Sequence, residues 1–84
     1  MELVVLTPEK EYFKGDIISL TVPGISGEFE VLKDHAPLVS ALTAGEVRIK
    51  KKDGDILKFN VNQGFLEVIN NDLALLVKKI EAKD

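Results

Sequence analysis

The sequence predicts an all-β protein, a flattened antiparallel β-sandwich or barrel of two sheets with about 8–10 short strands. Three observations lead to this class. Short apolar or alternating segments follow one another along the chain, turn-forming residues separate them at close spacing, and no long amphipathic helical pattern is present. The length of 84 residues suits a single domain, taken as residues 1–84, with one small core.

The composition is that of a globular chain without disulfides, with 45% hydrophobic and 30% charged residues and no cysteine. The net charge of −3 argues against nucleic acid as a partner, because phosphate recognition needs a clustered positive surface. The lysine run at 50–52 is followed at once by acids and is interpreted as a solvated hairpin tip. The sequence shows no membrane-spanning apolar run and no signal peptide, so direct membrane insertion is not expected.

The segments predicted as strands share an apolar, β-branched or alternating character. In chain order they are Leu3–Thr7, Tyr12–Val22, Glu28–Leu32, Leu38–Leu42, Glu46–Lys50, Leu57–Val61, Phe65–Ile69 and Leu73–Val77. The turn signals between them are Pro8, Pro23-Gly24, Pro37, Gly45, Asp53-Gly54, Gly64 and Asn70-Asn71. Gly15-Asp16 is expected to interrupt the second strand, and the charged run at 78–84 is expected to be a tail.

Three segments allow a more detailed prediction, namely the turn at Asp53-Gly54, the strand that ends at Val22 and the segment that begins at Leu73. Asp53-Gly54 can supply the positive φ angles that both central positions of a two-residue type I′ turn need, so such a hairpin is predicted there. The alternation of Ile18, Leu20 and Val22 places their side chains together on one strand face. Leu73–Ala82 is compatible with a helix by propensity alone, but the preceding asparagine turn and the regular succession of hairpins favour a strand.

Several strands also carry apolar side chains opposite the predicted core set, which includes Val47 and Ile49. These outward residues are Val4, Leu6, Ile17, Leu66 and Leu76. A small two-sheet sandwich buries only its inner faces, so these side chains would form an exposed apolar surface unless something else covers them. The pattern therefore indicates a protein-binding module.

The stretch Ser26–Leu38 holds the only histidine, His35, and the acids Glu28, Glu30 and Asp34. One histidine with scattered acids lacks the ligand spacing of a zinc site, and no nucleophile motif or phosphate-binding loop accompanies it. No catalytic, metal-binding or cofactor-binding residue is therefore predicted. His35 is interpreted as a hydrogen-bonded loop residue that pins its turn, and Glu28 as either a solvated carboxylate or an anchor to a partner.

Three groups of residues, spread over nearly the whole chain, form a specific combination. They are Val22–Gly24 with Gly27–Phe29, His35–Leu38 with Leu42 and Gly45, and Gly64–Val68. Together they resemble the N-terminal β domain of the epsilon subunit of F-type ATP synthases. The resemblance implies a flattened β-sandwich in the central rotor stalk, a non-catalytic subunit that links the gamma subunit to the c-ring and couples proton or sodium flow to ATP synthesis.

The same resemblance implies which residues meet each partner. The contact with the polar loops of the c-ring is expected at Gly27, Glu28, Phe29 and Glu30, and the contact with the gamma subunit at His35, Ala36, Pro37 and Ser40. A carboxylate on a short rigid loop suits the first contact, because it accepts charge-assisted hydrogen bonds. The chain departs from the family at Glu30 and Gln63, where glycine is common, and Glu30 adds a negative charge to the expected c-ring surface.

Most members of the resembled family continue into a C-terminal pair of helices, which carries an inhibitory function and, in some members, an ATP site. This sequence ends at Asp84, so neither helix-hairpin autoinhibition nor ATP binding is expected. The expected location is peripheral, on the cytoplasmic face of a bacterial inner membrane or on another energy-transducing membrane.

Two other hypotheses come from different classes of protein. One is a free-standing β-sandwich module that binds a protein or a small ligand such as a sugar, for which exposed aromatic residues would be expected; only one Tyr and four Phe are available. The other is a small hydrolase that uses Glu28 and His35. A His35→Ala variant distinguishes the hydrolase from the stalk subunit, because an enzyme would lose activity whereas a stalk subunit would lose only assembly or coupling.

Overall fold

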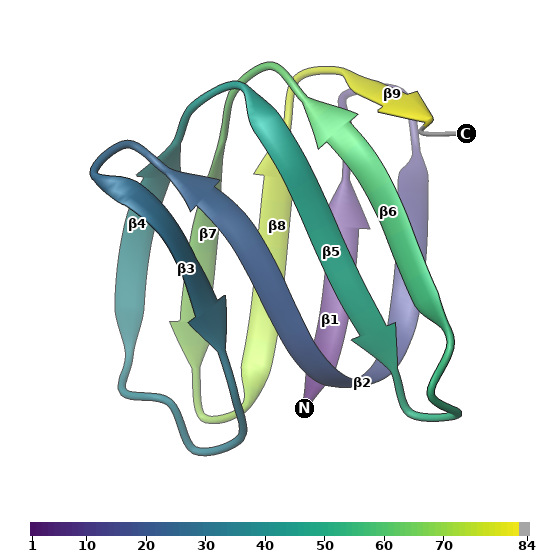
Figure 1. The fold of residues 1–84 in the computed structure, drawn as a ribbon, viewed down its shortest axis with the longest axis vertical. Coiled ribbons are helices and arrows are strands. Elements are labelled where there is room, and N and C mark those ends of the chain that lie inside the picture. The colour runs from purple at the N-terminus through teal and green to yellow at the C-terminus, as the bar shows by residue number, and fades with distance from the viewer. Residues whose placement is uncertain (83–84) are drawn as a thin grey trace.

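The computed structural model describes residues 1–82, which form nine strands and no helix (Figure 1). The strands are β1 (Glu2–Leu6), β2 (Glu11–Gly24), β3 (Gly27–Val31), β4 (Leu38–Leu42), β5 (Gly45–Lys51), β6 (Ile56–Val61), β7 (Gly64–Ile69), β8 (Asp72–Val77) and β9 (Ile80–Ala82). The predicted all-β class is confirmed. Within the expected tail, β9 pairs with β6, whereas Lys83 and Asp84 lie outside the described residues. Nothing in residues 1–82 is a helix that could cross a membrane.

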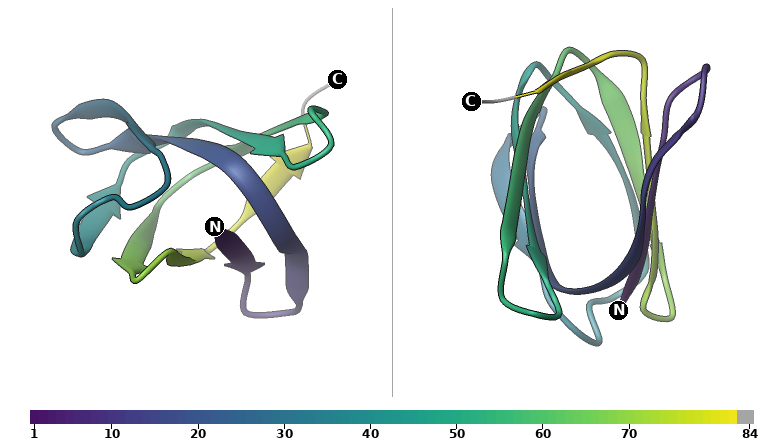
Figure 2. Two further views of the ribbon diagram at one scale, coloured as in Figure 1. Left: turned by 90° about the horizontal axis from the view of Figure 1, so that it is seen from below. Right: turned by 90° about the vertical axis from the view of Figure 1, so that its right-hand side faces the viewer.

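Two layers are made from one continuous sheet, because the long strand β2 belongs to both. The front layer is ordered β3-β2-β5-β6-β9, and the back layer is ordered β4-β7-β8-β1-β2. Gly15 and Asp16 do not interrupt β2 as expected, since both pair with β1. The layers meet where Gly24 of β2 pairs with Leu42 of β4, and Figure 2 shows the resulting flattened barrel from the side.

One strand pair differs from the expected antiparallel arrangement, because β1 and β8 run parallel. The turn after β1 sends the chain back along β2, with the Thr7 backbone nitrogen donating to the Lys10 carbonyl oxygen at 2.9 Å. This hairpin sets the direction of β1, and β8 lies along its other edge. The parallel pair is therefore decided by long-range packing and not by a turn, and the sheet is mixed.

The core lies between the two layers and is filled from alternate positions of their strands. Val47 and Ile49, predicted to point inward, are fully buried. The ring of Tyr12 meets that of Phe59 edge-on, with 5.0 Å between the ring centroids. The buried apolar residues include Leu3, Val5, Ile17, Leu20, Val22, Val31, Leu42, Val47, Ile49, Phe59, Val61, Leu66, Val68, Leu73, Leu75 and Val77.

A β-bulge between Ile17 and Ser19 breaks the alternation predicted for β2. A bulge adds one residue to one strand of a pair and so reverses the faces on either side of it. Ile17 is consequently buried, with 4% exposure, while Ile18 is 44% exposed. The predictions that Ile17 points outward and that Ile18 shares the core face with Leu20 and Val22 are both wrong for this reason.

The outward apolar set is also wrong at Leu66, which is fully buried. Leu66 pairs with buried Leu75 of β8, and the preceding residue, Phe65, takes the outer position with 56% exposure. An error of one residue reverses every side chain of a strand, which explains the difference. Leu76 is 46% exposed, as predicted.

The β5–β6 hairpin has a longer turn than predicted. Of its two central residues only Gly54 has a positive φ, 95°, so the type I′ turn expected at Asp53-Gly54 is wrong. The Gly54 nitrogen donates to the Lys51 carbonyl oxygen at 2.9 Å, and the Asp55 nitrogen donates to Asp53 Oδ1 at 2.9 Å. The aspartate side chain therefore caps its own turn, and one left-handed glycine completes it.

The turn with two positive φ angles is found at Asn70 (49°) and Asn71 (65°). It joins the paired residues Ile69 of β7 and Asp72 of β8, which is the arrangement of a two-residue hairpin. The prediction of a strand at Leu73–Val77 is confirmed.

Candidate functional site

The β2–β3 hairpin carries the residues expected at the c-ring, and it needs glycine at two positions. Gly27 has a φ of 130°, which L side chains rarely adopt. A Cβ atom on Gly24 would lie 2.7 Å from the Gly27 carbonyl oxygen and 2.8 Å from a ring carbon of Phe29. Because Gly24 has no side chain, the two strands approach closely and Phe29 packs, half-buried, against the core; Gly27 is needed for its backbone conformation, since a Cβ atom there would meet nothing within 4 Å.

The outer face of the front layer is polar around this hairpin. Thr21 of β2 pairs with Glu30 of β3 on one side and with Arg48 of β5 on the other. Pro23 of β2 pairs with Glu28 of β3. Thr21 is only 9% exposed although it lies on this outer face, since longer side chains from the flanking strands extend over β2.

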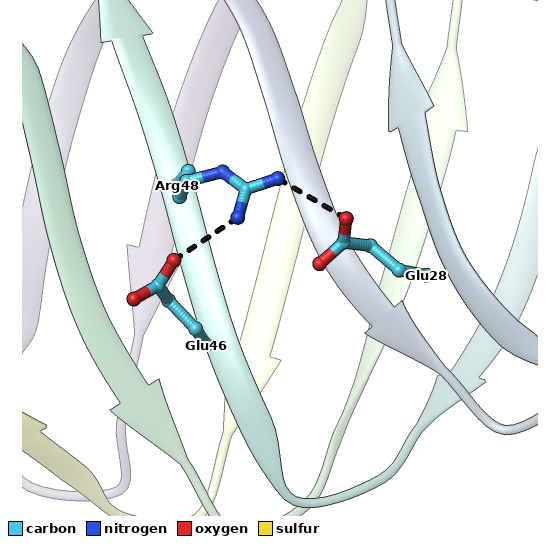
Figure 3. A network of polar contacts seen from close by, with 3 residues as sticks. All are labelled: Glu28, Glu46 and Arg48. Carbon is cyan, nitrogen blue, oxygen red and sulfur yellow. Dashed lines mark hydrogen bonds and ion pairs between the residues drawn. The ribbon is translucent and has the colours of Figure 1, made fainter.

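Arg48 joins the two strands that flank β2 (Figure 3). Its Nη2 lies 3.1 Å from Glu28 Oε1 on β3, and its Nη1 lies 3.1 Å from Glu46 Oε1 on β5. Side-chain exposure rises from 19% at Glu46 through 39% at Arg48 to 54% at Glu28. We call these three residues the Arg48 network; it is anchored at Glu46 and opens to solvent at Glu28.

The hydrogen bonds of the Arg48 network stabilise its positive charge. The bond to Glu46, and next the bond to Glu28, raises the pKa of the Arg48 guanidinium, which is a cation at neutral pH even without them. Two carboxylates and one guanidinium leave the network with a single negative charge. Glu30, on the same face, adds another.

Sequence reasoning singled out Glu28 but missed Arg48 and Glu46. The alternation of β5 already indicated that both point outward. The partner of Arg48 lies 20 residues away, however, and the two meet only because β3 and β5 both pair with β2.

The β3–β4 loop holds His35 in a fixed turn. His35 Nδ1 lies 2.8 Å from the Ala36 carbonyl oxygen, which can only accept, so this nitrogen donates. The His35 backbone nitrogen donates to the Leu32 carbonyl oxygen at 3.1 Å. The interpretation of His35 as a hydrogen-bonded loop residue is confirmed.

Asp34 ties this loop to the β7–β8 turn. Its backbone nitrogen donates to Asn71 Oδ1 at 2.7 Å, and Asn71 Nδ2 donates to Asp34 Oδ1 at 3.0 Å. The Asn71 carbonyl oxygen also accepts from the Glu2 backbone nitrogen at 3.0 Å. The loop, the turn and the start of β1 are therefore joined.

The two predicted contact sets are only partly separated. Gly27 begins β3 beside the hairpin tip and His35 lies in the loop that follows the strand, whereas Ser40 of β4 lines the same shallow pocket as Gly27 and Phe29. A strand of this length spans about 15 Å. A hydrolase would need Glu28 and His35 within hydrogen-bond reach, and this geometry keeps them apart. Residues 1–82 also contain no cluster of His, Asp and Glu suited to a metal ion.

Ser40 of β4 is half-buried and pairs with buried Leu66. Its Oγ donates to the Ala41 carbonyl oxygen at 3.3 Å. The neighbouring Val39 points to the other side of the strand and is 72% exposed. A partner on the outer side of β4 would therefore meet Val39 and Ala41 before Ser40.

The outer face of the back layer is apolar where four strands align. Ala41, Phe65, Leu76 and Leu6 are in register across β4, β7, β8 and β1, and the Ile25 nitrogen donates to the Ala41 carbonyl oxygen at 3.2 Å. We call these five residues the apolar stripe. Ile25, Phe65 and Leu76 are 67%, 56% and 46% exposed. An open groove of about 640 Å³ runs along the stripe.

Comparison with known proteins identifies relatives over almost the full length. Residues 1–83 match the family described as ATP synthase, Delta/Epsilon chain, beta-sandwich domain. The chain is 42% identical over 78 residues to the ATP synthase epsilon chain of Chlorobaculum tepidum, which covers 93% of this chain and 89% of that protein. It is 36% identical over 76 residues to the ATP synthase epsilon chain of Clostridium kluyveri, which covers 90% of this chain but 58% of that protein.

Solved structures share the fold. A chain of the Euglena gracilis mitochondrial ATP synthase (OSCP/F1/c-ring, rotational state 1) matches with a TM-score of 0.88 at 18% identity, over 95% of this chain and 51% of that one. A chain of the Tetrahymena thermophila mitochondrial ATP synthase (central stalk/c-ring) matches with a TM-score of 0.81 at 19% identity, over 96% of this chain and 65% of that one. At such identities these structures show the fold alone. Because the family match spans residues 1–83, the chain belongs to the ATP synthase delta/epsilon β-sandwich family.

Proposed function

We propose that this protein is a non-catalytic central-stalk subunit of an F-type ATP synthase, which links the gamma subunit to the c-ring and couples ion flow to ATP synthesis. Its family and the names of its relatives support the proposal. The structural observation that carries it is a pair of chemically different outer faces on one closed sandwich, with the Arg48 network on the front layer and the apolar stripe on the back layer. Such a domain is suited to hold two different partners at once.

The c-ring contact is proposed at Gly27, Glu28, Phe29 and Glu30. Glu28 and Glu30 are exposed carboxylates on the outer face of β3. They are suited to accept charge-assisted hydrogen bonds from the N–H and O–H groups of a polar loop. Phe29 is half-buried against the core and would support the hairpin from below, while Gly27 allows its backbone path.

The gamma contact is proposed at His35, Ala36, Pro37 and Ser40, and we extend it to the apolar stripe. A contiguous group of exposed apolar side chains on a small domain is typical of a protein-binding surface. Burial of such a surface contributes about 25 cal/mol per Å². Ser40 would contribute through its outward neighbours Val39 and Ala41.

These partners would place the protein at the surface of an energy-transducing membrane. We infer a peripheral location on the cytoplasmic face of a bacterial inner membrane, held there by protein contacts. The proposal assigns no catalytic residue, cofactor, metal ion or ATP site to this domain.

Reconstitution tests the proposal. An F-type ATP synthase from which the epsilon subunit has been removed is combined with the full chain, and binding and ion-driven ATP synthesis are measured. The chain should co-purify with the gamma subunit and the c-ring and should restore coupled synthesis. Failure to bind either partner at native ionic strength would refute the proposal.

A free-standing ligand-binding module is the second candidate, and the groove of about 640 Å³ favours it. An apolar fluorescent dye should then bind the groove saturably and lose its site in a Leu76→Asp variant. Addition of the purified gamma subunit separates the two candidates. Displacement of the dye by gamma would assign the groove to the stalk interface, whereas dye binding without any gamma binding would favour the module.

A further inference from the structure

The fold places Arg48 of β5 within reach of Glu28 on β3. Neighbouring strands lie about 4.8 Å apart, so β5 and β3, which flank β2, are separated by about 10 Å. Two long side chains extended toward each other close this gap, and Arg48 Nη2 reaches Glu28 Oε1 at 3.1 Å. Lys58, the partner of Arg48 on β6, lies one strand farther away.

Arg48 bonds to Glu28 and not to Glu30, the other acid on the outer face of β3. Glu30 lies in the same cross-strand row as Arg48, because both pair with Thr21. Arg48 nevertheless bonds to Glu28, which is nearer the hairpin tip. Glu46, on the same strand and face as Arg48, accepts a hydrogen bond from Nη1 at 3.1 Å. Glu46 thereby draws the guanidinium toward the end of the sheet where Glu28 lies.

We propose that Arg48 is a positioning residue for the c-ring contact and that it acts through Glu28 alone. Arg48 holds Glu28 by Oε1, so that Oε2 of the same carboxylate accepts a hydrogen bond from an N–H group of the docked loop. This inference rests on the proposed function, in which Glu28 meets the c-ring. Glu30, for which no ion pair is found within residues 1–82, contributes negative potential without a fixed position.

The chemistry of arginine suits this role. Its planar guanidinium offers two nitrogens in a fork, and here each nitrogen holds a different carboxylate. Lysine carries one compact ammonium group on a flexible stem. It would keep the charge but would not fix the Glu28 carboxylate between the two strands.

The test measures binding of the full chain to a detergent-solubilised assembly of the gamma subunit and the c-ring. Because a hydrogen bond to a charged group is lost, Glu28→Gln should weaken binding about tenfold. Arg48→Gln should weaken it about fivefold, and Arg48→Lys should recover part of this loss. The double variant should remain at about tenfold, because Arg48 has nothing to position once Glu28 is changed.

Lys58→Gln is the matched control, since it removes the same charge from the neighbouring strand. It should change binding less than about twofold, as expected for an isolated surface charge. All variants should melt within about 2 °C of the parent, because exposed ion pairs contribute little to stability. An unchanged melting temperature would show that Arg48 positions Glu28 and is not needed for folding.

The results that would overturn the inference differ from the result that would overturn the proposed function. Losses that multiply in the double variant, to about fiftyfold, would show that Arg48 acts independently of Glu28 and would overturn the inference. The inference would also be overturned if Arg48→Gln bound as tightly as the parent, or if Lys58→Gln weakened binding as much as Arg48→Gln. In either case, weaker binding of Glu28→Gln would still support the proposed function. A chain that does not bind the assembly at all would overturn the proposed function together with this inference.

Discussion

The two outer faces of the sandwich obey the same strand alternation but present different chemistry. On the front layer, Glu28, Glu46 and Arg48 bond to one another across β2. On the back layer, Phe65 and Leu76 stand half-exposed in an apolar row. The inner sides of both layers are lined by buried apolar residues. The inner positions therefore specify the fold, while the outer positions are available for partners.

The two faces also differ in what they contribute to binding. Exposed ion pairs contribute little to stability, so the Arg48 network matters for geometry. An apolar surface contributes in proportion to the area that a partner covers. We therefore expect the back face to supply most of the affinity and the front face to supply orientation.

The largest expected effect comes from Gly64, which lies beneath the apolar stripe. A Cβ atom there would collide with the Leu76 carbonyl oxygen and lie 2.8 Å from Val77 Cγ1. Gly64→Ala should lower the free energy of unfolding by about 3 kcal/mol, measured by urea denaturation, because β7 and β8 must separate. Gly54→Ala is the control: its Cβ atom meets nothing within 4 Å, and its positive φ should cost only about 1 kcal/mol. Equal losses would show that the close approach of β7 and β8 is not needed.

Leu76→Asp should have the next largest effect, on binding and not on folding. A charge in the centre of the stripe should weaken binding to the gamma subunit about thirtyfold, or about 2 kcal/mol, measured by biolayer interferometry. Thermal unfolding should change little, since Leu76 is 46% exposed. The matched control is Ile56→Asp, at a residue of β6 that is 58% exposed on the front layer. If both substitutions weaken gamma binding alike, the distinction between the faces fails.

The smallest effect is expected from Glu28→Ala, and it should depend on salt. Binding to the c-ring assembly should fall about tenfold at low ionic strength and about threefold at ~0.5 M salt, because exposed charges are screened. The loss caused by Leu76→Asp should stay constant over the same range, because apolar burial is not screened. Glu30→Ala should weaken binding less than Glu28→Ala. A thermal melt that shows an unfolded Glu28→Ala domain would instead make Glu28 a structural residue.

Much of the fold could be predicted from local patterns. The strand at Leu38–Leu42 has the predicted bounds, and the turn predicted at Asn70-Asn71 is present, with both residues at positive φ. Both depend on properties of neighbouring residues, namely side-chain alternation and tolerance of positive φ. The face of Ile18 could not be predicted in this way, because the bulge beside it exists only in the pairing of β2 with β5.

The candidate site likewise has features that local sequence predicts and features that only strand pairing creates. Its acids, its glycines and the loop of His35 follow from residue type and spacing, because turns and outward carboxylates are local features. Three features do not follow from residue type and spacing. They are the pairing of Glu28 with Arg48, the burial of Thr21 beneath the front-layer side chains, and the alignment of the apolar stripe. They join residues that are distant in the chain, and such residues meet only when strands pair. Sequence patterns therefore identified the hairpin and its carboxylates, and only the tertiary structure paired one of these carboxylates with an arginine, because that arginine lies on a strand distant in the chain.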